Sequence, residues 1–481
     1  MEVLMVFTML LTLFLSFLLS LFFHFRRKNY SKRLPPGSLG LPFIGQSFDL
    51  LKALKSDKIE EWFHERIAKH GPVWKVNVLG YPTVVLNGLA ANKFVYSNSD
   101  GITLANTHPP SMSRILGFKN IVELTGDDYK RVKASMVSFL KIDMLKQYVA
   151  KVDDEIQHHL QMYWHGKNEV KVQPLMKTLT FDVICSLLFG IERGPKREQL
   201  LPLFEVMLLS VLAIPINFPF SKLNRGLKAR MKLVNIVEEL LRQKRESVQD
   251  ETNPQKDLIT SFLNSHDDDN GTRMSDEEII DNIVLVMVAG YDTTSTFLTL
   301  FIRLLANNES IYSDILREHE EISKSKSPGE ALTWEDLAKM TYTWRVASEV
   351  LRLNALGVLT FRRAARDIEY EGYVIPKGWQ VMLSSTVTHM DDSIFQNPTV
   401  FDPARFDKTI HPPPPPFSLV GFGGGARMCP GMEFAKMETL VLIHRLVTQF
   451  KWELFNKEEA FKRIPLPEFD QGLFVQIKPL K

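Results

Sequence analysis

The chain has 481 residues, of which 45% are apolar and 24% are charged, so it can build a large hydrophobic core and lacks the composition of a disordered protein. Its formal net charge of +2 gives no case for binding nucleic acid. The two cysteines, Cys185 and Cys429, lie far apart among neighbours unlike those of a zinc pair, and so few cysteines exclude a disulfide framework.

The N-terminal end predicts a membrane anchor. The run from Val3 to Phe23 is uncharged and rich in Leu and Phe, and at about 1.5 Å per residue it spans a hydrocarbon core of about 30 Å. A cleaved secretory signal is the alternative, but such a signal has basic residues before a shorter apolar region. Here the basic residues follow the run, which places the body of the protein in the cytosol; they are Arg26, Arg27, Lys28, Lys32 and Arg33.

A proline-rich segment follows the anchor. Pro35, Pro36 and Pro42 stiffen the chain, while Gly37 and Gly45 permit turns. Three segments are therefore expected: residues 1–25 as a transmembrane anchor with its flanks, residues 26–46 as a basic and proline-rich hinge, and residues 47–481 as the main folded domain. A generic linker is the simpler interpretation of the hinge.

Beyond the hinge, the chain predicts mostly helix, with strands toward both ends. The runs 73–78 and 83–86 flank Gly80-Tyr81-Pro82 as in a hairpin. Ser275 and Glu278 form a capping box that opens a very apolar helix from Asp276 to about Leu305. Helical spacing also covers 227–243, and strand patterns return within 368–383 and 472–477. The predicted fold is mainly α with small β-sheets.

The long apolar helix contains a locally weak segment, Ala289-Gly290-Tyr291-Asp292-Thr293-Thr294. Glycine costs about 1 kcal/mol against alanine inside a helix, and threonine side chains can bond back to carbonyls. The segment predicts that the helix opens here for function. A kink at a packing contact is the alternative.

A charged pair, Glu349-x-x-Arg352, stands in a segment whose apolar residues indicate a buried helix. Residues at i and i+3 share a helix face, and a buried ion pair is costly unless further hydrogen bonds satisfy it. Arg405, in the segment Phe401 to Phe406, is the natural third member. The alternative is an ordinary surface pair, because Glu-x-x-Arg is common by itself.

The most informative segment surrounds Cys429 and runs from Phe422 to Gly431 as Phe-Gly-Gly-Gly-Ala-Arg-Met-Cys-Pro-Gly. Its glycines permit tight turns and close approach to a sulfur, and the helical pattern from Glu433 to Val447 would place a helix N-terminus just beyond that sulfur. Arg427 could reach a haem propionate. The segment predicts a thiolate that ligates haem iron.

Two other interpretations of this segment were weighed. Gly421-x-Gly423-x-x-Ala426 matches a dinucleotide-binding fingerprint, but five prolines precede it and Pro430 falls where the crossover helix should continue. The second is a glycine-rich surface loop with an incidental cysteine.

Together these motifs resemble plant microsomal cytochromes P450, over the whole length of the chain. The pattern Phe-x-x-Gly-x-Arg-x-Cys-x-Gly is met at every fixed position of 422–431, and the segments 361–364 and 373–379 resemble one plant clan that oxidises terpenoids, sterols and related hormones. Within that clan the chain looks closest to oxidases of triterpenoids, diterpenoids and taxanes. The resemblance implies the cytochrome P450 fold, preceded by a single N-terminal transmembrane helix.

The resemblance also implies roles for individual residues. Cys429 would ligate the iron of heme b, with Phe422 and Gly431 as the other fixed positions of the loop. Thr293 would bond bound dioxygen and Asp292 would relay protons. Glu349, Arg352 and Arg405 would form a structural triad. The residues that resemble propionate ligands are Arg427, Arg362, Lys133 and Tyr129.

The chain departs from the family pattern at two places. Asn354-Ala355-Leu356 stands where two prolines are common, so the loop that reaches the haem edge is altered. Tyr129-x-x-x-Lys133 stands where the family has Trp or His and Arg, and lysine lacks the planar fork of arginine.

The implied function is a haem-thiolate monooxygenase that inserts one oxygen atom from O2 into a C–H bond of a lipophilic, terpenoid or sterol-like substrate. The sequence has no credible nicotinamide or flavin site, so the resemblance implies electrons from the NADPH–cytochrome P450 reductase at the endoplasmic reticulum membrane. The apolar stretch 203–220 suits a lid on the membrane side. The rival functions are a haem-thiolate isomerase or dehydratase that uses no dioxygen, and a haem-binding protein without turnover.

Overall fold

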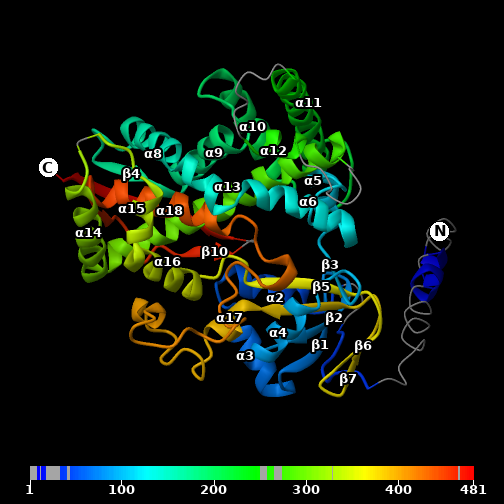
Figure 1. Cartoon of the computed structure of the whole chain (residues 1–481). Coiled ribbons are helices and arrows are strands. Elements are labelled where there is room, and N and C mark those ends of the chain that lie inside the picture. Colours follow the sequence, from blue (N-terminus) through cyan, green and yellow to red (C-terminus); the bar gives the residue numbers. More distant parts are fainter. Residues whose placement is uncertain are drawn as a thin grey trace.

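The computed structural model describes residues 8–10, 12–17, 33–40, 44–249, 257–264, 273–327, 329–463 and 466–480. It has a mainly helical part and a smaller part built on a β-sheet, and α13 (Asp276–Asn307) and α18 (Met432–Val447) lie within the helical part (Figure 1). The predicted fold class, mainly α with small β-sheets, is confirmed.

One five-stranded sheet organises the smaller part. Its strand order is β1 (Val73–Val78), β2 (Tyr81–Leu86), β8 (Gln380–Ser384), β5 (Leu359–Ala364) and β3 (Leu104–Asn106). The predicted hairpin is β1–β2, which pairs from Val73 with Leu86 to Val78 with Tyr81. The second strand begins two residues earlier than predicted because Pro82 sits at the turn end, opposite Asn77. The helices of this part are α2 (Ser47–Lys55), α3 (Ile59–His70), α4 (Leu89–Ser97) and α17 (Ser385–His389).

The other strands form small sheets. A three-stranded sheet has the order β4 (Glu169–Lys171), β12 (Phe474–Pro479) and β9 (Phe450–Leu454). Two further pairs are β6 (Ile368–Tyr370) with β7 (Tyr373–Ile375), and β10 (Phe461–Arg463) with β11 (Pro467–Phe469). The predicted strand region 368–383 therefore contains three strands of two different sheets.

The remaining helices pack around α13 (Asp276–Asn307), most of which is buried. Ser275 and Glu278 form the predicted capping box, with both reciprocal bonds present. The sequence predicted an opening near Gly290, but α13 is continuous through it, because α9 packs along the same turn, where Thr180 donates to the Tyr291 carbonyl. The helices are α5 (Pro110–Leu116), α6 (Gly126–Phe139), α7 (Ile142–Leu145), η1 (Lys146–Tyr148), α8 (Val149–Tyr163), α9 (Val172–Leu188), α10 (Pro195–Leu208), α11 (Lys222–Gln249), α12 (Leu258–Leu263), α14 (Glu309–Lys324), α15 (Trp334–Lys339), α16 (Thr341–Leu353), η2 (Pro403–Phe406), η3 (Gly425–Arg427) and α18 (Met432–Val447).

The described residues of the predicted hinge form hydrogen bonds with strands β1 and β7. The Pro36 carbonyl accepts from the Lys75 amide at 2.8 Å, and the Arg33 carbonyl accepts from the Val374 amide at 2.8 Å. A Cβ added to Gly37 would lie 2.4 Å from the Lys75 carbonyl oxygen, so only glycine fits there. Residues 33–40 of the predicted hinge therefore contact the folded body directly.

The predicted anchor lies largely outside the described residues. Its described part is an apolar helix, Thr8–Phe17, whose large side chains are exposed, Phe14 and Phe17 among them. Over the described chain, α13 is the one helix long and apolar enough to cross a membrane, and because most of its apolar stretch is buried it is the core helix of the folded body.

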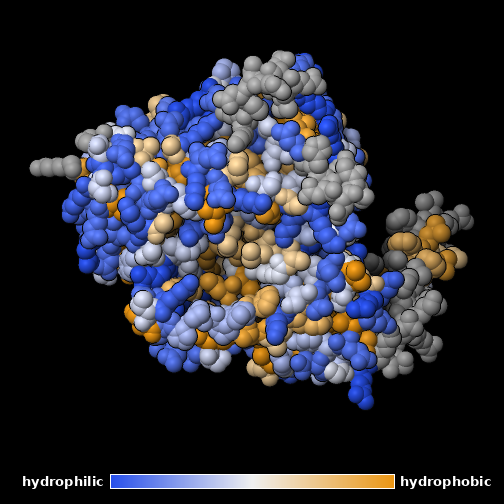
Figure 2. All heavy atoms as spheres, viewed as in Figure 1, coloured by the Kyte–Doolittle hydropathy of each residue, from blue (hydrophilic) through white to orange (hydrophobic). Residues whose placement is uncertain are grey.

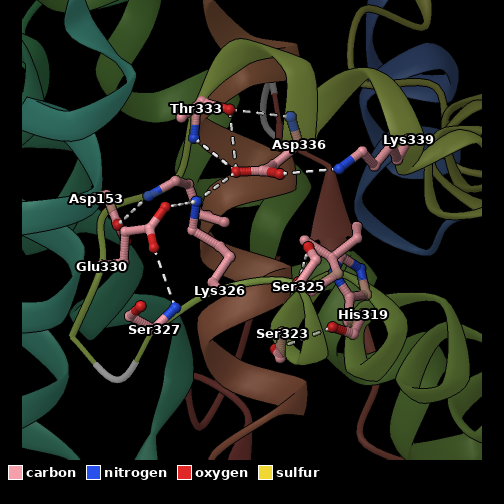
Figure 3. A network of polar contacts seen from close by, with 12 residues as sticks. Asp153, His319, Ser323, Ser325, Lys326, Ser327, Glu330, Thr333, Asp336 and Lys339 are labelled. Carbon is pink, nitrogen blue, oxygen red and sulfur yellow. Dashed lines mark hydrogen bonds and ion pairs between the residues drawn. The ribbon is translucent and has the colours of Figure 1, made fainter.

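A polar network ties the connection between α14 and α15 to the rest of the helical part (Figure 3). The Asp336 carboxylate accepts from Lys326 Nζ at 2.8 Å and from the Thr333 amide at 3.0 Å, while the Asp153 carboxylate accepts from the Leu332 amide at 2.9 Å. Burial acts to raise the pKa of Asp336, but the hydrogen bonds from Lys326 and Thr333 outweigh it and lower that pKa to about 2.

We expect Asp336→Asn to lower the free energy of unfolding at pH 7 by about 2 kcal/mol, because the Lys326 ammonium loses one of its two carboxylate partners and keeps only Glu330. A folded-state pKa below the unfolded value of 3.8 means that the carboxylate stabilises above pH 4, and that this contribution is lost as the pH falls toward 2. Denaturant unfolding across this range tests both statements. Asp314→Asn is the control, since its ion pair with Arg317 is exposed; equal losses in both variants would contradict the role of the network.

Candidate active site

A stripe of accessible residues runs along one face of α13, although the rest of that helix is buried. Val286, Ala289, Gly290 and Thr293 recur at i, i+3, i+4 and i+7, and all are partly or fully exposed. Across from the helical part, β5 is partly exposed from Leu359 to Arg362, although β8 and β3 flank it on both edges. Figure 2 shows apolar side chains gathered in a hollow between the two parts of the molecule. The exposure of these residues is explained if α13 and β5 border that hollow.

Cys429 is exposed although it lies deep in the protein, so its thiol borders open space and not packed atoms. Burial raises the pKa of this thiol, and the hydrogen bond from the Gly431 amide acts against that rise. The next residues begin α18, so the helix N-terminus lies just beyond the sulfur as predicted from the sequence. A Cβ added to Gly431 would stand 3.9 Å from Sγ, so the glycine keeps the space beside the sulfur open.

The loop before Cys429 is closed by backbone bonds. The Cys429 amide donates to the Phe422 carbonyl at 2.9 Å, and the Gly423 amide donates to the Val420 carbonyl at 2.9 Å. Gly425 has a φ of 63°, and a Cβ there would lie 2.1 Å from the Tyr96 carbonyl oxygen. No other residue fits at position 425, because both the backbone conformation and the contact with α4 exclude a side chain.

Two guanidinium groups lie close to this loop. Arg427 donates to the Ile121 and Leu124 carbonyls, each at 2.8 Å, and Arg362 donates to Ser99 Oγ at 2.9 Å. Burial lowers the pKa of Arg362, and the nearby charge of Arg427 lowers it further. Neither group has a carboxylate partner among the residues that the structure describes. Half-buried like charges of this kind indicate a site for an anion.

Tyr129 and Lys133, both on α6, converge on one carbonyl. The Tyr129 hydroxyl donates to the Ala426 carbonyl at 2.6 Å, and Lys133 Nζ donates to the same oxygen. The Arg427 guanidinium lies 3.5 Å from the centre of the Tyr129 ring, as in a cation–π contact. The resemblance assigns Tyr129 and Lys133 to a propionate, and both side chains also donate to the cysteine loop.

Asp292 and Thr293 stand on the accessible side of α13. The Asp292 carboxylate lies 3.4 Å from Lys177 Nζ of α9, and Thr293 Oγ1 donates to the Ala289 carbonyl at 2.5 Å. The sequence gave no indication of Lys177, because its pairing arises only when α9 packs along α13. An acid and a hydroxyl are thereby placed side by side at the edge of the hollow.

The three charged residues of the predicted triad meet. Glu349 Oε2 accepts from Arg352 Nε at 2.7 Å, and Glu349 Oε1 lies 3.3 Å from Arg405 Nε. Both Glu349 and Arg352 are completely buried. The Asp402 amide also donates to Glu349 at 3.0 Å, so the carboxylate has the additional bonds that burial requires.

A family model for cytochrome P450 matches residues 35–481. The chain belongs to the cytochrome P450 family. It is therefore an enzyme of the cytochrome P450 monooxygenase class, and the family implies a haem iron. The residues around Cys429 fit that cofactor, since an open thiol suits iron, and two guanidiniums without carboxylate partners in the described chain suit the haem carboxylates.

The relatives of this P450 include plant hydroxylases. Taxane 10-beta-hydroxylase of Taxus cuspidata is 36% identical over 97% of this chain and 93% of its own length. Beta-amyrin 28-monooxygenase of Panax ginseng is 35% identical over 98% of both chains. Among solved structures, retinoic acid bound cyanobacterial CYP120A1 superposes with a TM-score of 0.82 at 30% identity, covering 94% of this chain and 100% of that one.

The contacts of Tyr129 predict a graded response to substitution. Tyr129→Phe removes one hydrogen bond and keeps the ring beneath Arg427, so we expect a loss of about 1 kcal/mol in the free energy of unfolding. Tyr129→Ala also removes the ring, and about 3 kcal/mol should be lost together with part of the bound haem. Denaturant unfolding and the haem-to-protein absorbance ratio test this order, with Tyr163→Phe at an exposed tyrosine as the control. Equal behaviour of the two Tyr129 variants would contradict it.

Proposed function

We propose that this P450 is a haem-thiolate monooxygenase whose iron ligand is Cys429. The observation that carries the proposal is the open thiol at the helix α18 N-terminus, beside two guanidiniums without carboxylate partners in the described chain. When bound, haem activates O2 so that one oxygen atom enters a C–H bond and the other leaves as water. The balance is R–H, O2, NADPH and a proton giving R–OH, water and NADP⁺.

Arg362 and Arg427 would bind the haem propionates. Each guanidinium keeps N–H groups beyond those it donates to the protein, and a carboxylate would neutralise both charges. Tyr129 and Lys133 then act on the loop, since both donate to the carbonyl of Ala426, three residues before Cys429. The neighbouring groups thus hold the haem edge and the loop in a fixed relation.

Asp292 and Thr293 would deliver protons to the reacting oxygen. The Thr293 hydroxyl can turn from the Ala289 carbonyl to a ligand in the hollow, because hydroxyl rotation costs only one hydrogen bond of about 1 kcal/mol. Lys177 Nζ lies 3.4 Å from the Asp292 carboxylate, and this pair holds the carboxylate between α9 and α13. The carboxylate could therefore accept a proton from solvent and pass it to the hydroxyl. Glu349, Arg352 and Arg405 lie apart from this chemistry and stabilise the fold.

The substrate would be a terpenoid or a sterol-like molecule. The apolar side chains that gather in the hollow suit a lipophilic skeleton, and so do Val286, Ala289 and Gly290 on the accessible face of α13. The relatives named above act on taxanes and on beta-amyrin, both of them cyclic terpenoids, and they align over nearly the whole chain. A cyclic triterpenoid or a taxane-like diterpenoid is the substrate class we infer.

We place the protein at the endoplasmic reticulum membrane, with residues 1–25 as a single-pass anchor, residues 26–46 as the adjoining hinge and residues 47–481 as a cytosolic catalytic domain. The exposed apolar helix Thr8–Phe17 supports the anchor. The connection between α10 and α11 supports a second membrane contact through its exposed side chains, which are Leu209, Leu212, Ile214, Ile216, Phe218 and Phe220. Electrons would come from the NADPH–cytochrome P450 reductase of the same membrane.

The carbon monoxide difference spectrum of the reduced membrane protein tests the iron ligand. We expect the long-wavelength band of thiolate-ligated haem, and its loss in Cys429→Ser, because a hydroxyl is a far weaker donor to iron than a thiolate. Cys185→Ala is the control: this cysteine is fully buried in the core, so the variant should keep the band at somewhat lower stability. A wild-type protein with only the short-wavelength band, or with no haem, would contradict the proposal.

Proton delivery is tested by comparing product formed with NADPH consumed, using a terpenoid that the wild-type enzyme hydroxylates in the presence of reductase. We expect Thr293→Ala and Asp292→Asn to lower product formation on the order of 10²-fold, because a positioned proton donor contributes about that much. NADPH oxidation should continue, with peroxide as the product. Thr294→Ala is the matched control, since the neighbouring Thr294 is buried away from the hollow. An unchanged ratio of product to NADPH would exclude the two residues from proton delivery.

A further inference from the structure

His389, at the end of α17, is completely buried and bonds on both sides of its ring. Its Nδ1 lies 3.1 Å from the Arg352 carbonyl oxygen on α16. Its Nε2 lies 3.0 Å from the amide nitrogen of Val420, on the segment that leads into the cysteine loop. One imidazole thus joins two segments that are far apart in sequence.

The partners determine which ring nitrogen carries the proton. The Val420 amide can only donate, so Nε2 must be the acceptor, and the Arg352 carbonyl can only accept, so Nδ1 must carry the hydrogen. Burial lowers the pKa of His389 to about 4, and the positive Arg352 guanidinium adds to this, although the bond to the Arg352 carbonyl acts in the opposite direction. The ring is neutral at physiological pH, and both of its bonds are satisfied in this single tautomer.

Both ends of this bridge are themselves fixed. On one side, Arg352 bonds Glu349 and also donates to the His389 carbonyl at 2.8 Å, so residue 389 and Arg352 are joined by two reciprocal bonds. On the other side, the Val420 carbonyl accepts from the Gly423 amide, where the tight turns before Cys429 begin. The Phe422 carbonyl then accepts from the Cys429 amide itself.

We propose that His389 is a positioning residue for the cysteine ligand: its neutral imidazole transmits the fixed position of the buried Glu349–Arg352 pair to Val420, and so sets where the Cys429 loop begins. The inference rests on the proposed function of Cys429. It assigns a specific task to the ion pair, which touches no substrate: the pair provides the rigid base from which the loop is held.

A second buried histidine supplies the contrast. His159 on α8 is almost fully buried, but neither ring nitrogen has a hydrogen-bond partner among the residues that the structure describes, and the ring packs against Tyr163. His159 fills space, whereas His389 makes directed bonds to two backbone groups. Replacement by leucine removes a buried imidazole at either position. Only His389→Leu also removes two hydrogen bonds to backbone groups.

The test compares His389→Leu, His389→Gln and His159→Leu in the full-length holoprotein. The first readout is hydrogen exchange of the peptide containing the Val420 amide. We expect exchange in His389→Leu to be about tenfold faster than in wild type, and His159→Leu to match wild type. Glutamine offers an N–H donor and an oxygen acceptor separated by one carbon, as the two ring nitrogens are, so His389→Gln should recover most of the protection.

The second readout is the rate at which the thiolate carbon monoxide band converts to the short-wavelength form under mild denaturant. We expect conversion to be about tenfold faster in His389→Leu, near wild type in His389→Gln, and unchanged in His159→Leu. Wild-type exchange and conversion in His389→Leu would overturn the inference, as would equal acceleration in His159→Leu. If His389→Leu does not fold, the wild-type amide decides: slow exchange at Val420 supports the bridge, and exchange at the rate of an open loop overturns it.

The two proposals fail in distinguishable ways. A wild-type protein without the thiolate band contradicts the role of Cys429, whatever the Val420 amide does. A wild-type protein with the thiolate band and an unprotected Val420 amide contradicts only the role of His389.

Discussion

The site depends on one constraint: the sulfur of Cys429 must face open space while the backbone around it stays fixed. An exposed loop in water would meet the first condition and fail the second. Here the loop is held from three sides, because Gly425 closes against the Tyr96 carbonyl, Tyr129 bonds the Ala426 carbonyl, and Val420 bonds His389. Every one of these contacts uses a backbone group of the loop, so its shape is fixed without any side chain entering the space beside the sulfur.

The charges around the hollow follow from the same constraint. Two guanidiniums without carboxylate partners in the described chain would be expensive to bury, and Arg362 and Arg427 reduce that cost only in part through bonds to neutral oxygens. The N–H groups of these two guanidiniums that make no bond within the protein would bind an anionic cofactor. Binding such a cofactor would therefore stabilise the folded protein by relieving repulsion, as well as by filling apolar space. Cofactor and fold are coupled through these two residues.

The sequence predicted the motifs better than their surroundings. The capping box at Ser275, the β1–β2 hairpin and the helix after Cys429 follow from local spacing, and the structure has all three. Spacing also brought Glu349 and Arg352 onto one helix face, but Lys177 and His389 were missed, because their partners come from segments more than thirty residues away. The contact between the Tyr129 hydroxyl and the Ala426 carbonyl of the loop was likewise not predicted from the sequence. Local sequence spacing therefore identifies the functional groups, whereas tertiary packing determines which atoms those groups contact.

The continuous course of α13 shows how packing overrides local weakness. Glycine and threonine at 290, 293 and 294 lower helix propensity, yet α9 packs along the same turn, where Thr180 bonds the Tyr291 carbonyl at 3.2 Å and Ile184 lies 3.0 Å from the place a Gly290 Cβ would take. The side of this helical turn that faces α9 is thus tightly packed. Ala289 and Thr293 lie on its accessible side. A glycine at 290 serves close approach to α9, and this explains its presence without any break in the helix. The same turn can then offer the Thr293 hydroxyl to the hollow from a rigid backbone, which is the condition for directed proton transfer.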